Sequence, residues 1–221
     1  MNISRIYICI VMLFAISCSG AREVQKRDNL GRVSAVSYYD GNALIRTEEF
    51  SYYGNSHNPW AIIYKKKKGL ELKPYREEEY VFSNNNLERI SFFVYRGGEK
   101  EKAGMIRYFY KSERTDRIEY YTYRKEQQQF FIFGLEQHFY NGDEMTSRRI
   151  IEFEFNGQTQ KSMQIGQYVV YYEKGSISWM HSWIMNKKSK KIVEKKEFNS
   201  DLISNKVAFI EDFYMQRSRG K

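Results

Sequence analysis

A seven-residue pattern that recurs four times constrains the fold of this chain more than any other feature. Each copy has a basic residue, Ile or Val, two variable residues, an apolar or aromatic residue, one variable residue and an aromatic residue. The copies begin at Arg32, Arg89, Arg117 and Arg149. Because side chains alternate across a β-strand, the first, fifth and seventh positions share one face. The pattern therefore predicts four strands, with the core on the face bearing Val36, Tyr38, Phe93, Tyr95, Tyr121, Tyr123, Phe153 and Phe155.

Strand-like runs precede three of these copies, at 80–82, 105–110 and 135–140. The residues between them are rich in Asn, Ser, Asp and Gly, which favour turns, at 84–86, 112–116 and 141–143. Each pair is therefore predicted to form a hairpin. Further strands are predicted at 167–172, 177–185, 192–198 and 207–214, with turns at 174–175 and 186–190.

The composition points the same way. Aromatic residues make up 17% of the chain, with 19 Tyr and 15 Phe, alongside 29% charged residues. Tyr and Phe favour the half-buried surface of a pleated sheet. We therefore expect an all-β protein, an antiparallel meander of hairpins that forms an extended, curled or barrel-like sheet.

The N-terminal segment has the features of an export signal. A single basic residue, Arg5, precedes an apolar stretch at 6–17, and small residues close it. A membrane-spanning helix needs about 20 apolar residues, and this stretch is shorter. Cleavage after Ala21 would release a secreted protein, whereas cleavage before Cys18 would make that cysteine the first residue of the mature chain.

The segment 14–18, Phe-Ala-Ile-Ser-Cys, resembles a bacterial lipobox of the relaxed kind found in spirochaete lipoproteins. The resemblance implies that Cys18 carries a diacylglyceryl thioether and an amide-linked acyl chain. Two or more acyl chains make membrane attachment stable. We therefore predict a lipoprotein signal peptide at 1–17, and an envelope lipoprotein held at the outer membrane by Cys18.

The remaining chain is predicted to be a polar tether at 18–29 and a single β-rich domain at 30–221. Between Gly31 and Phe155 the alternation of aromatic strands, turns and Arg-Ile starts resembles the tyrosine-rich YD repeats of RHS-type proteins and β-meander repeats of bacterial surface lipoproteins. Repeats of this kind need neighbours to bury their rings.

The charge balance indicates the kind of partner. The formal net charge is +9 at pH 7, which suits acidic polysaccharide, anionic lipid headgroups or nucleic acid. Export disfavours nucleic acid. We expect anionic polysaccharide or another envelope or host macromolecule as the partner.

Three tryptophans and one histidine are the candidate ligand-binding residues. Trp179, His181 and Trp183 alternate and so share a strand face, where they could stack on a sugar ring or pack in the core. Trp60 stands shortly before the lysine run 65–68, which could engage an acidic group or form a solvated loop.

No catalytic motif or metal-site spacing occurs in the sequence, so we expect no catalytic residues, no metal and no cofactor. His138 is expected to be a sheet residue, and the acidic doublets alternate between faces. We predict a lipid-anchored, non-enzymatic binding or structural module with a basic, aromatic-rich sheet. The alternative is a secreted or anchored glycan-active enzyme that uses two carboxylates.

Overall fold

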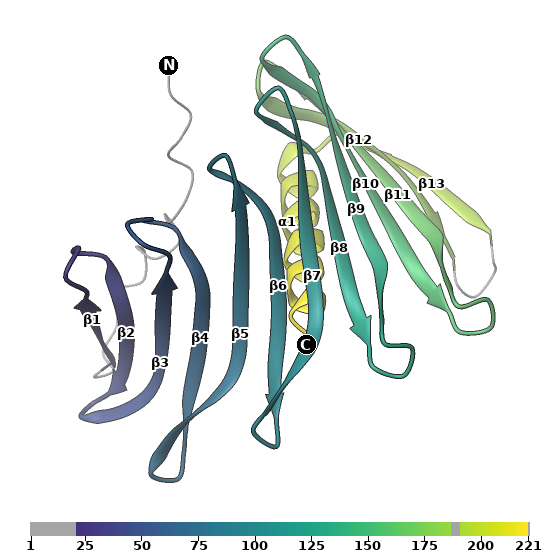
Figure 1. The fold of residues 1–221 in the computed structure, drawn as a ribbon. Coiled ribbons are helices and arrows are strands. Elements are labelled where there is room, and N and C mark those ends of the chain that lie inside the picture. Colours follow the sequence, from purple (N-terminus) through teal and green to yellow (C-terminus); the bar gives the residue numbers. More distant parts are fainter. Residues whose placement is uncertain (1–20, 187–190, 221) are drawn as a thin grey trace.

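The computed structural model describes residues 21–186 and 191–220, which form one antiparallel sheet and one helix (Figure 1). The predicted signal peptide, Cys18 and the lysines at 187–190 lie outside the described residues. The elements in chain order are β1 (Ala21–Arg27), β2 (Val33–Asp40), β3 (Ala43–Tyr52), β4 (Pro59–Lys68), β5 (Glu71–Ser83), β6 (Asn86–Arg96), β7 (Glu99–Lys111), β8 (Arg114–Arg124), β9 (Gln129–Asn141), β10 (Glu144–Asn156), β11 (Lys161–Glu173), β12 (Ser176–Met185), β13 (Ile192–Glu197) and α1 (Ser200–Ser218).

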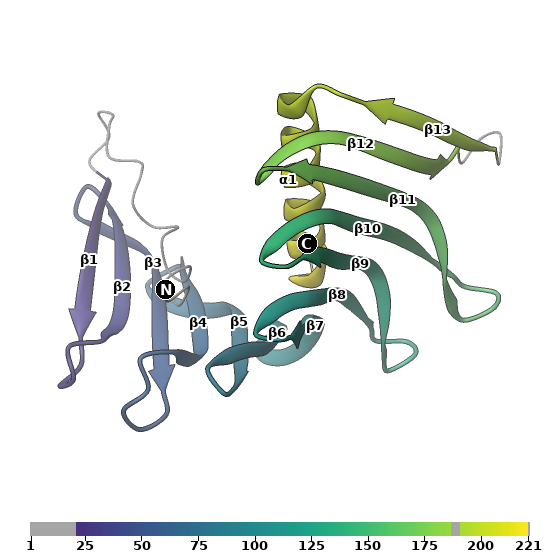
Figure 2. The same cartoon turned by 90° about the horizontal axis from the view of Figure 1, so that it is seen from above.

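Every strand pairs with the next one along the chain, so the sheet is a 13-stranded meander with β1 and β13 at its edges. The all-β fold predicted from the sequence is confirmed, and the sheet is open and curled. All the strand pairs except β12–β13 contain a register shift. Bulges of this kind bend a strand and increase its twist. The result is a deeply curved sheet, seen from above in Figure 2.

The predicted turns are tight and use the left-handed backbone region. Asn84 and Asn85 have φ values of 49° and 65°, and Gly142 has a φ of 57°. Asn and Gly tolerate this region better than other residues do. The hairpins predicted around these turns are therefore confirmed.

Two predicted segments differ in the structure. The part of the expected tether at Ala21–Arg27 is a strand, β1, which pairs with β2. The segment 207–214, predicted as a strand, lies within helix α1. Its Val, Phe and Tyr residues favour strands, but its buried positions recur every three or four residues, and that spacing suits a helix.

Helix α1 begins with a capping interaction. The side chain of Asn199 accepts a hydrogen bond from the backbone N–H of Leu202, and Asp201 lies in the first turn. Both features stabilise a helix N-terminus, where backbone donors lack partners. The buried side chains Ile203, Val207, Ile210, Tyr214 and Ser218 form the face that packs on the sheet.

The helix lies on the concave side of the curved sheet, against strands that include β7, β8 and β12 (Figure 2). Two glycines permit the close approach. A Cβ atom on Gly104 would lie 2.1 Å from the carbonyl oxygen of Ser218, and one on Gly134 would lie 2.6 Å from the ring of Tyr214. Any larger residue at either position would push the helix away from the sheet.

The core lies between α1 and the concave face, which corrects the predicted core face. Ile90, Phe92, Ile106, Tyr120 and Ile150 are buried there with the helix. Ile90, Phe92, Tyr120 and Ile150 occupy the second and fourth positions of the seven-residue pattern, and Ile106 precedes its third copy. The fifth and seventh positions of the second and third copies are on the convex face. Val36, the fifth residue of the first copy, is buried as predicted, and Phe155, the seventh of the fourth copy, packs against buried Phe131. The rings of Phe93, Tyr95, Tyr121 and Tyr123 are only half-buried. The core is on the concave face because α1 covers that face, and the seven-residue pattern does not indicate where the helix packs.

A buried ion network holds the helix on the sheet. Glu136, which is fully buried, accepts hydrogen bonds from the Tyr120 hydroxyl at 2.7 Å and from Nε of Arg148 at 3.0 Å. The same guanidinium pairs with Glu211 of α1. Burial alone would raise the pKa of Glu136, but the hydrogen bonds and charge of His138, Arg148 and Tyr120 outweigh it and lower that pKa.

Candidate functional site

The convex face of the sheet has no helix on it, and a row of arginines crosses it. The row contains Arg107 of β7, Arg117 of β8 and Arg149 of β10. Each is next to an isoleucine of the core: Ile106 and Ile150 are buried, and Ile118 beside Arg117 is partly buried. Because neighbours along a strand alternate, these arginines point to the convex side. The pairing register continues this row to His181 of β12.

Aromatic rings hold the three guanidinium groups at the convex surface. The guanidinium carbons of Arg107 and Arg117 lie 5.0 and 4.1 Å from the ring centre of Phe109, and that of Arg149 lies 5.4 Å from the ring of Phe139. A cation over the face of a ring is attracted by about 0.5–1 kcal/mol at exposed sites. The rings therefore position the charges without neutralising them.

One carboxylate, that of Glu119, accompanies this row. It lies 3.1 Å from Nε of Arg117 and accepts a hydrogen bond of 2.5 Å from the Tyr121 hydroxyl. Burial, followed by the hydrogen bond to Glu119, raises the pKa of Tyr121 to about 12. In the described part of the chain neither Arg107 nor Arg149 makes a salt bridge. The row of three arginines thus keeps a net positive charge.

The row ends at a stack of rings on β11, β12 and the residue that follows β13. Trp179 is stacked between Tyr171 and Phe198, with ring centres 4.0 and 6.2 Å away. The His181 ring lies 3.8 Å from that of Trp183 and pairs with Glu194. We call the row and the stack together, Arg107, Phe109, Arg117, Arg149, Tyr171, Trp179, His181 and Trp183, the convex strip.

The structure thus brings together three of the four candidate ligand-binding residues. Trp179, His181 and Trp183 share the convex face as the sequence predicts, outside the core between sheet and helix. Tyr171 stacks closely on the Trp179 ring, whereas the contact with Phe198 is looser, so a sugar could not stack on the Tyr171 side without displacing that ring. The sequence analysis did not propose the three arginines as a site, although Arg117 and Arg149 are first residues of the pattern and Arg107 precedes Tyr108.

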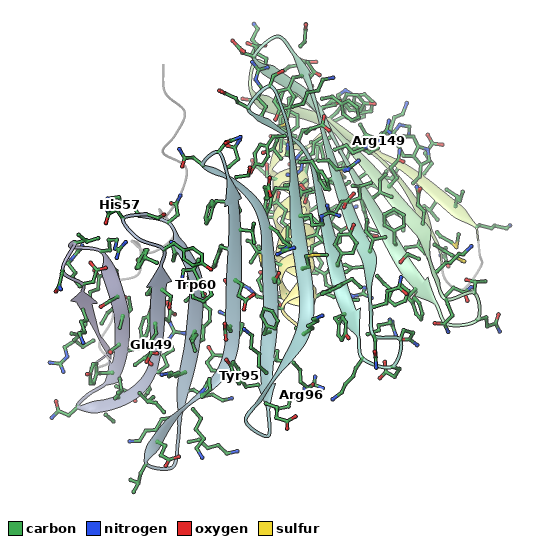
Figure 3. The ribbon with its side chains drawn as sticks, viewed as in Figure 1. Glu49, His57, Trp60, Tyr95, Arg96 and Arg149 are labelled. Carbon is green, nitrogen blue, oxygen red and sulfur yellow. The ribbon has the colours of Figure 1, made fainter. Side chains whose placement is uncertain are left out.

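Trp60 does not belong to this strip. It lies on β4, where it stacks on Tyr53 with ring centres 5.1 Å apart. Seven strands, β5–β11, separate β4 from β12, which at about 4.8 Å per strand step is roughly 38 Å along the sheet. Figure 3 shows Trp60 and Arg149 well apart along the sheet, Trp60 near its β1 end and Arg149 near its β13 end.

The lysine run at 65–68 forms the end of β4 instead of a loop. Lys65 pairs with Glu49 at 2.7 Å, and the ammonium of Lys66 lies 5.3 Å from the ring centre of Tyr75. The hairpin turns at Gly69, whose φ is 67°. The run is therefore partly used within the sheet and adds little to the convex strip.

Two carboxylates share a face at β5, which sequence reasoning missed because it compared only adjacent acids. Glu77 and Glu79 both contact the ammonium of Lys100, at 2.7 and 2.6 Å, and Glu77 accepts a hydrogen bond from Tyr95. Burial would lower the pKa of Lys100, but the two carboxylates outweigh it and raise that pKa. Lys100 thus stays charged between the two acids and pairs with both of them.

Clusters of metal-ligating residues and helices able to span a membrane are absent from residues 21–186 and 191–220. These residues contain no group of three or more His, Cys, Asp or Glu that could hold a metal ion. His138 lies 3.6 Å from buried Glu136 on β9, within the ion network that holds the helix. Helix α1 is not apolar enough to cross a membrane, and no other helix is present in the described part.

Comparisons with known proteins give partial structural similarity. No protein-family model and no curated protein matches the chain. A protein of unknown function from Bacteroides fragilis NCTC 9343 is 10% identical, with a TM-score of 0.42 over 56% of this chain and 91% of that chain.

Two DUF3836 family proteins are also similar in structure. One, from Bacteroides vulgatus ATCC 8482, is 10% identical, with a TM-score of 0.33 over 41% of this chain and 90% of that one. The other, from Parabacteroides distasonis ATCC 8503, is 10% identical, with a TM-score of 0.27 over 57% of this chain and 97% of that one. Similarity at this level assigns neither a family nor a function to the chain.

Proposed function

We propose that this chain is a lipid-anchored, non-catalytic binding module of a bacterial cell envelope whose convex strip binds an anionic polysaccharide. The observation that carries the proposal is the row of Arg107, Arg117 and Arg149, which is held on rings at a face that the helix leaves uncovered. Glu119 is the one carboxylate paired with it.

The chemistry of the row suits sulfate or carboxylate groups on an extended polymer. Guanidinium groups donate paired hydrogen bonds to such oxyanions. From β7 to β10 the arginines span three strand steps, or about 14 Å. A row of this length can contact several successive charges of one polymer. Since Tyr171 already stacks on the Trp179 ring, charge contributes more to this binding than sugar stacking does.

The proposed anchor is Cys18, which rests on the lipobox-like sequence. Strand β1 begins at Ala21, three residues after that cysteine, so the linking segment spans at most about 10 Å. In this proposal the sheet is therefore held close to the membrane by its β1 edge. The basic side chains of β1, which is exposed along its whole length, then face the headgroups.

The anchor is tested with Cys18→Ala expressed in a bacterial host. We expect the wild-type chain in the membrane fraction, with acyl mass on its N-terminal peptide, and the variant outside that fraction. Recovery of Cys18→Ala in the membrane fraction, or wild-type chain without acyl mass, would refute the anchor.

The ligand is tested with dextran sulfate as the probe and neutral dextran as the matched control. We expect the protein to bind dextran sulfate and not neutral dextran, with an affinity that falls as sodium chloride is raised from 50 to 500 mM, because salt screens exposed charges. Equal binding of the two polymers, or no binding of either, would refute the ligand class.

A further inference from the structure

A second electropositive feature lies on the other side of the sheet from the convex strip. An open cavity of about 410 Å³ is formed where the C-terminal end of α1 meets strands β6, β7 and β8. Its lining includes Val94, Ala103 and Thr122 from the strands and Gly220 from the turn after the helix. In volume it falls within the range typical of small-molecule sites.

Basic side chains outnumber acidic ones around this cavity. Five basic residues line it, Arg96, Lys102, Arg124, Lys125 and Arg217, against two acidic residues, Glu101 and Glu126, which is a surplus of three positive charges. The ammonium of Lys102 lies 5.6 Å from the ring centre of Tyr123, a contact that leaves its charge in place.

Glu101 is already used. It lies 2.7 Å from the ammonium of Lys125 and 3.8 Å from Arg96, and these contacts lower its pKa. By contrast, neither Arg124 nor Arg217 makes a salt bridge in the part of the chain that the structure describes. These two arginines therefore contribute to the surplus.

The two arginines repel each other. Burial, followed by the charge of Arg124, lowers the pKa of Arg217, and the charge of Glu154 opposes this only in part. In addition, Nε of Arg124 is enclosed and has no hydrogen-bond partner among the described residues. A buried donor without a partner costs free energy, and native structures rarely leave one unsatisfied.

Structural roles account for part of this arrangement only. A basic residue in the last turn, such as Arg217, is favoured by the helix dipole. Arg124 and Arg217 also lie over the rings of Phe155 and Phe133, at 4.2 and 4.7 Å. Neither effect explains why β8 places a second guanidinium beside the first at an open cavity.

We propose that this cavity is a binding site for a small tetrahedral oxyanion, a phosphate or sulfate group, held between the guanidinium groups of Arg124 and Arg217. Such a group accepts several hydrogen bonds and suits the planar donor set of arginine. The rings of Phe155 and Phe133 fix the guanidinium planes before the anion binds, which reduces the entropy lost on binding. The cavity exceeds the size of one oxyanion, which leaves room for a sugar attached to it.

This site is separate from the convex strip, so the experiment that tests it does not depend on the proposed function. Titration calorimetry of the full chain tests it with inorganic phosphate and inorganic sulfate, at constant ionic strength set with sodium chloride. Glucose 6-phosphate and glucose 6-sulfate form two further arms, which distinguish a free anion from the same group carried on a sugar.

We expect one saturable site for at least one of these probes. Arg217→Gln and Arg124→Gln should each weaken its binding at least tenfold. Arg96→Gln, an exposed position where folding is not at risk, should weaken it two- to fivefold because Glu101 is left with one partner fewer. Lys67→Gln, an exposed lysine of β4, is the charge-matched control and should bind as the wild type does.

Binding no stronger than that of chloride, for every probe, would overturn the proposal. So would a folded Arg217→Gln or Arg124→Gln variant with unchanged affinity. Should both of these variants fail to fold, unchanged affinity in Arg96→Gln would overturn it as well.

Discussion

Replacing Gly134 with Ala tests how closely the helix is fitted to the sheet. A Cβ atom at this position would lie 2.6, 2.8 and 2.9 Å from three ring atoms of Tyr214. The ring cannot move aside, because Tyr214 is 1% exposed and packs against Tyr120 and Phe133 with ring centres 4.9 and 5.6 Å apart. The helix must therefore shift or the ring must leave its preferred rotamer.

The expected cost is that of overpacking a filled core, about 1–3 kcal/mol. Ala is favoured over Gly in the interior of a strand by roughly 0.5–1 kcal/mol, which offsets part of it. We therefore expect Gly134→Ala to lower the free energy of unfolding by about 1–2 kcal/mol. With a urea m-value of roughly 2 kcal/mol/M, the midpoint should fall by ~0.5–1 M.

Urea unfolding followed by circular dichroism measures this, and Gly166→Ala is the matched control. A Cβ on Gly166 would lie 3.1 Å from a carboxylate oxygen of Glu152, the movable end of a side chain, and no closer to any other atom. Gly134→Ala should also cost less in a Tyr214→Val background, where the ring is absent. Equal midpoints for Gly134→Ala and Gly166→Ala would refute the reasoning.

Two further predictions concern the attachment and the start of the helix. Since the pKa of Glu136 is lowered on folding, its contribution to the free energy of unfolding is complete above the ordinary pKa of 4.5 and is lost as pH falls through the folded-state pKa. Glu136→Gln should lose about 3 kcal/mol of stability at pH 7, and its urea midpoint should fall less steeply than that of the wild type between pH 6 and 3. Parallel pH profiles of the two proteins would contradict this. Asn199→Ala should lower the free energy of unfolding by about 1 kcal/mol because the capping hydrogen bond from Leu202 is lost, whereas Asn199→Asp should keep that bond. Urea midpoints of the two variants and the wild type measure this, and equal midpoints for Asn199→Ala and the wild type would contradict the capping role.

Strand content could be predicted from the sequence because alternation and turn chemistry are local properties. The hairpin around Asn84 and Asn85 is an example, since those two residues suit the left-handed backbone that a tight turn needs. The register of successive hairpins then follows from the turns. The curl does not, because it depends on bulges whose positions have no clear local signal.

The core face could not be predicted, because both faces of the repeating strands are apolar or aromatic. Phe92 and Phe93 are neighbours, yet Phe92 is 1% exposed beneath the helix and Phe93 is half-buried on the convex side. A helix covers one of them, and that helix was itself predicted as a strand. The spacing of Ile203, Val207 and Ile210, together with a capping Asn199, is the signal that could have identified it.

The convex strip was only partly predictable for the same reason. Trp179, His181 and Trp183 share a face by alternation within one strand. The approach of Arg107, Arg117 and Arg149 depends on the register of three successive strand pairs, β7–β8, β8–β9 and β9–β10. Residues that meet across several strands have no spacing that a single sequence displays.

The central claim is that the arginines of the convex strip bind a polyanion, and the affinity of one triple variant for dextran sulfate tests it most directly. The variant Arg107→Gln, Arg117→Gln, Arg149→Gln is compared with Lys67→Gln, Lys73→Gln, Lys111→Gln, which removes the same charge from three exposed lysines. We predict that the arginine variant alone loses affinity for dextran sulfate at least tenfold and that its affinity depends less on salt. Equal affinities of the two variants, both folded, would contradict it.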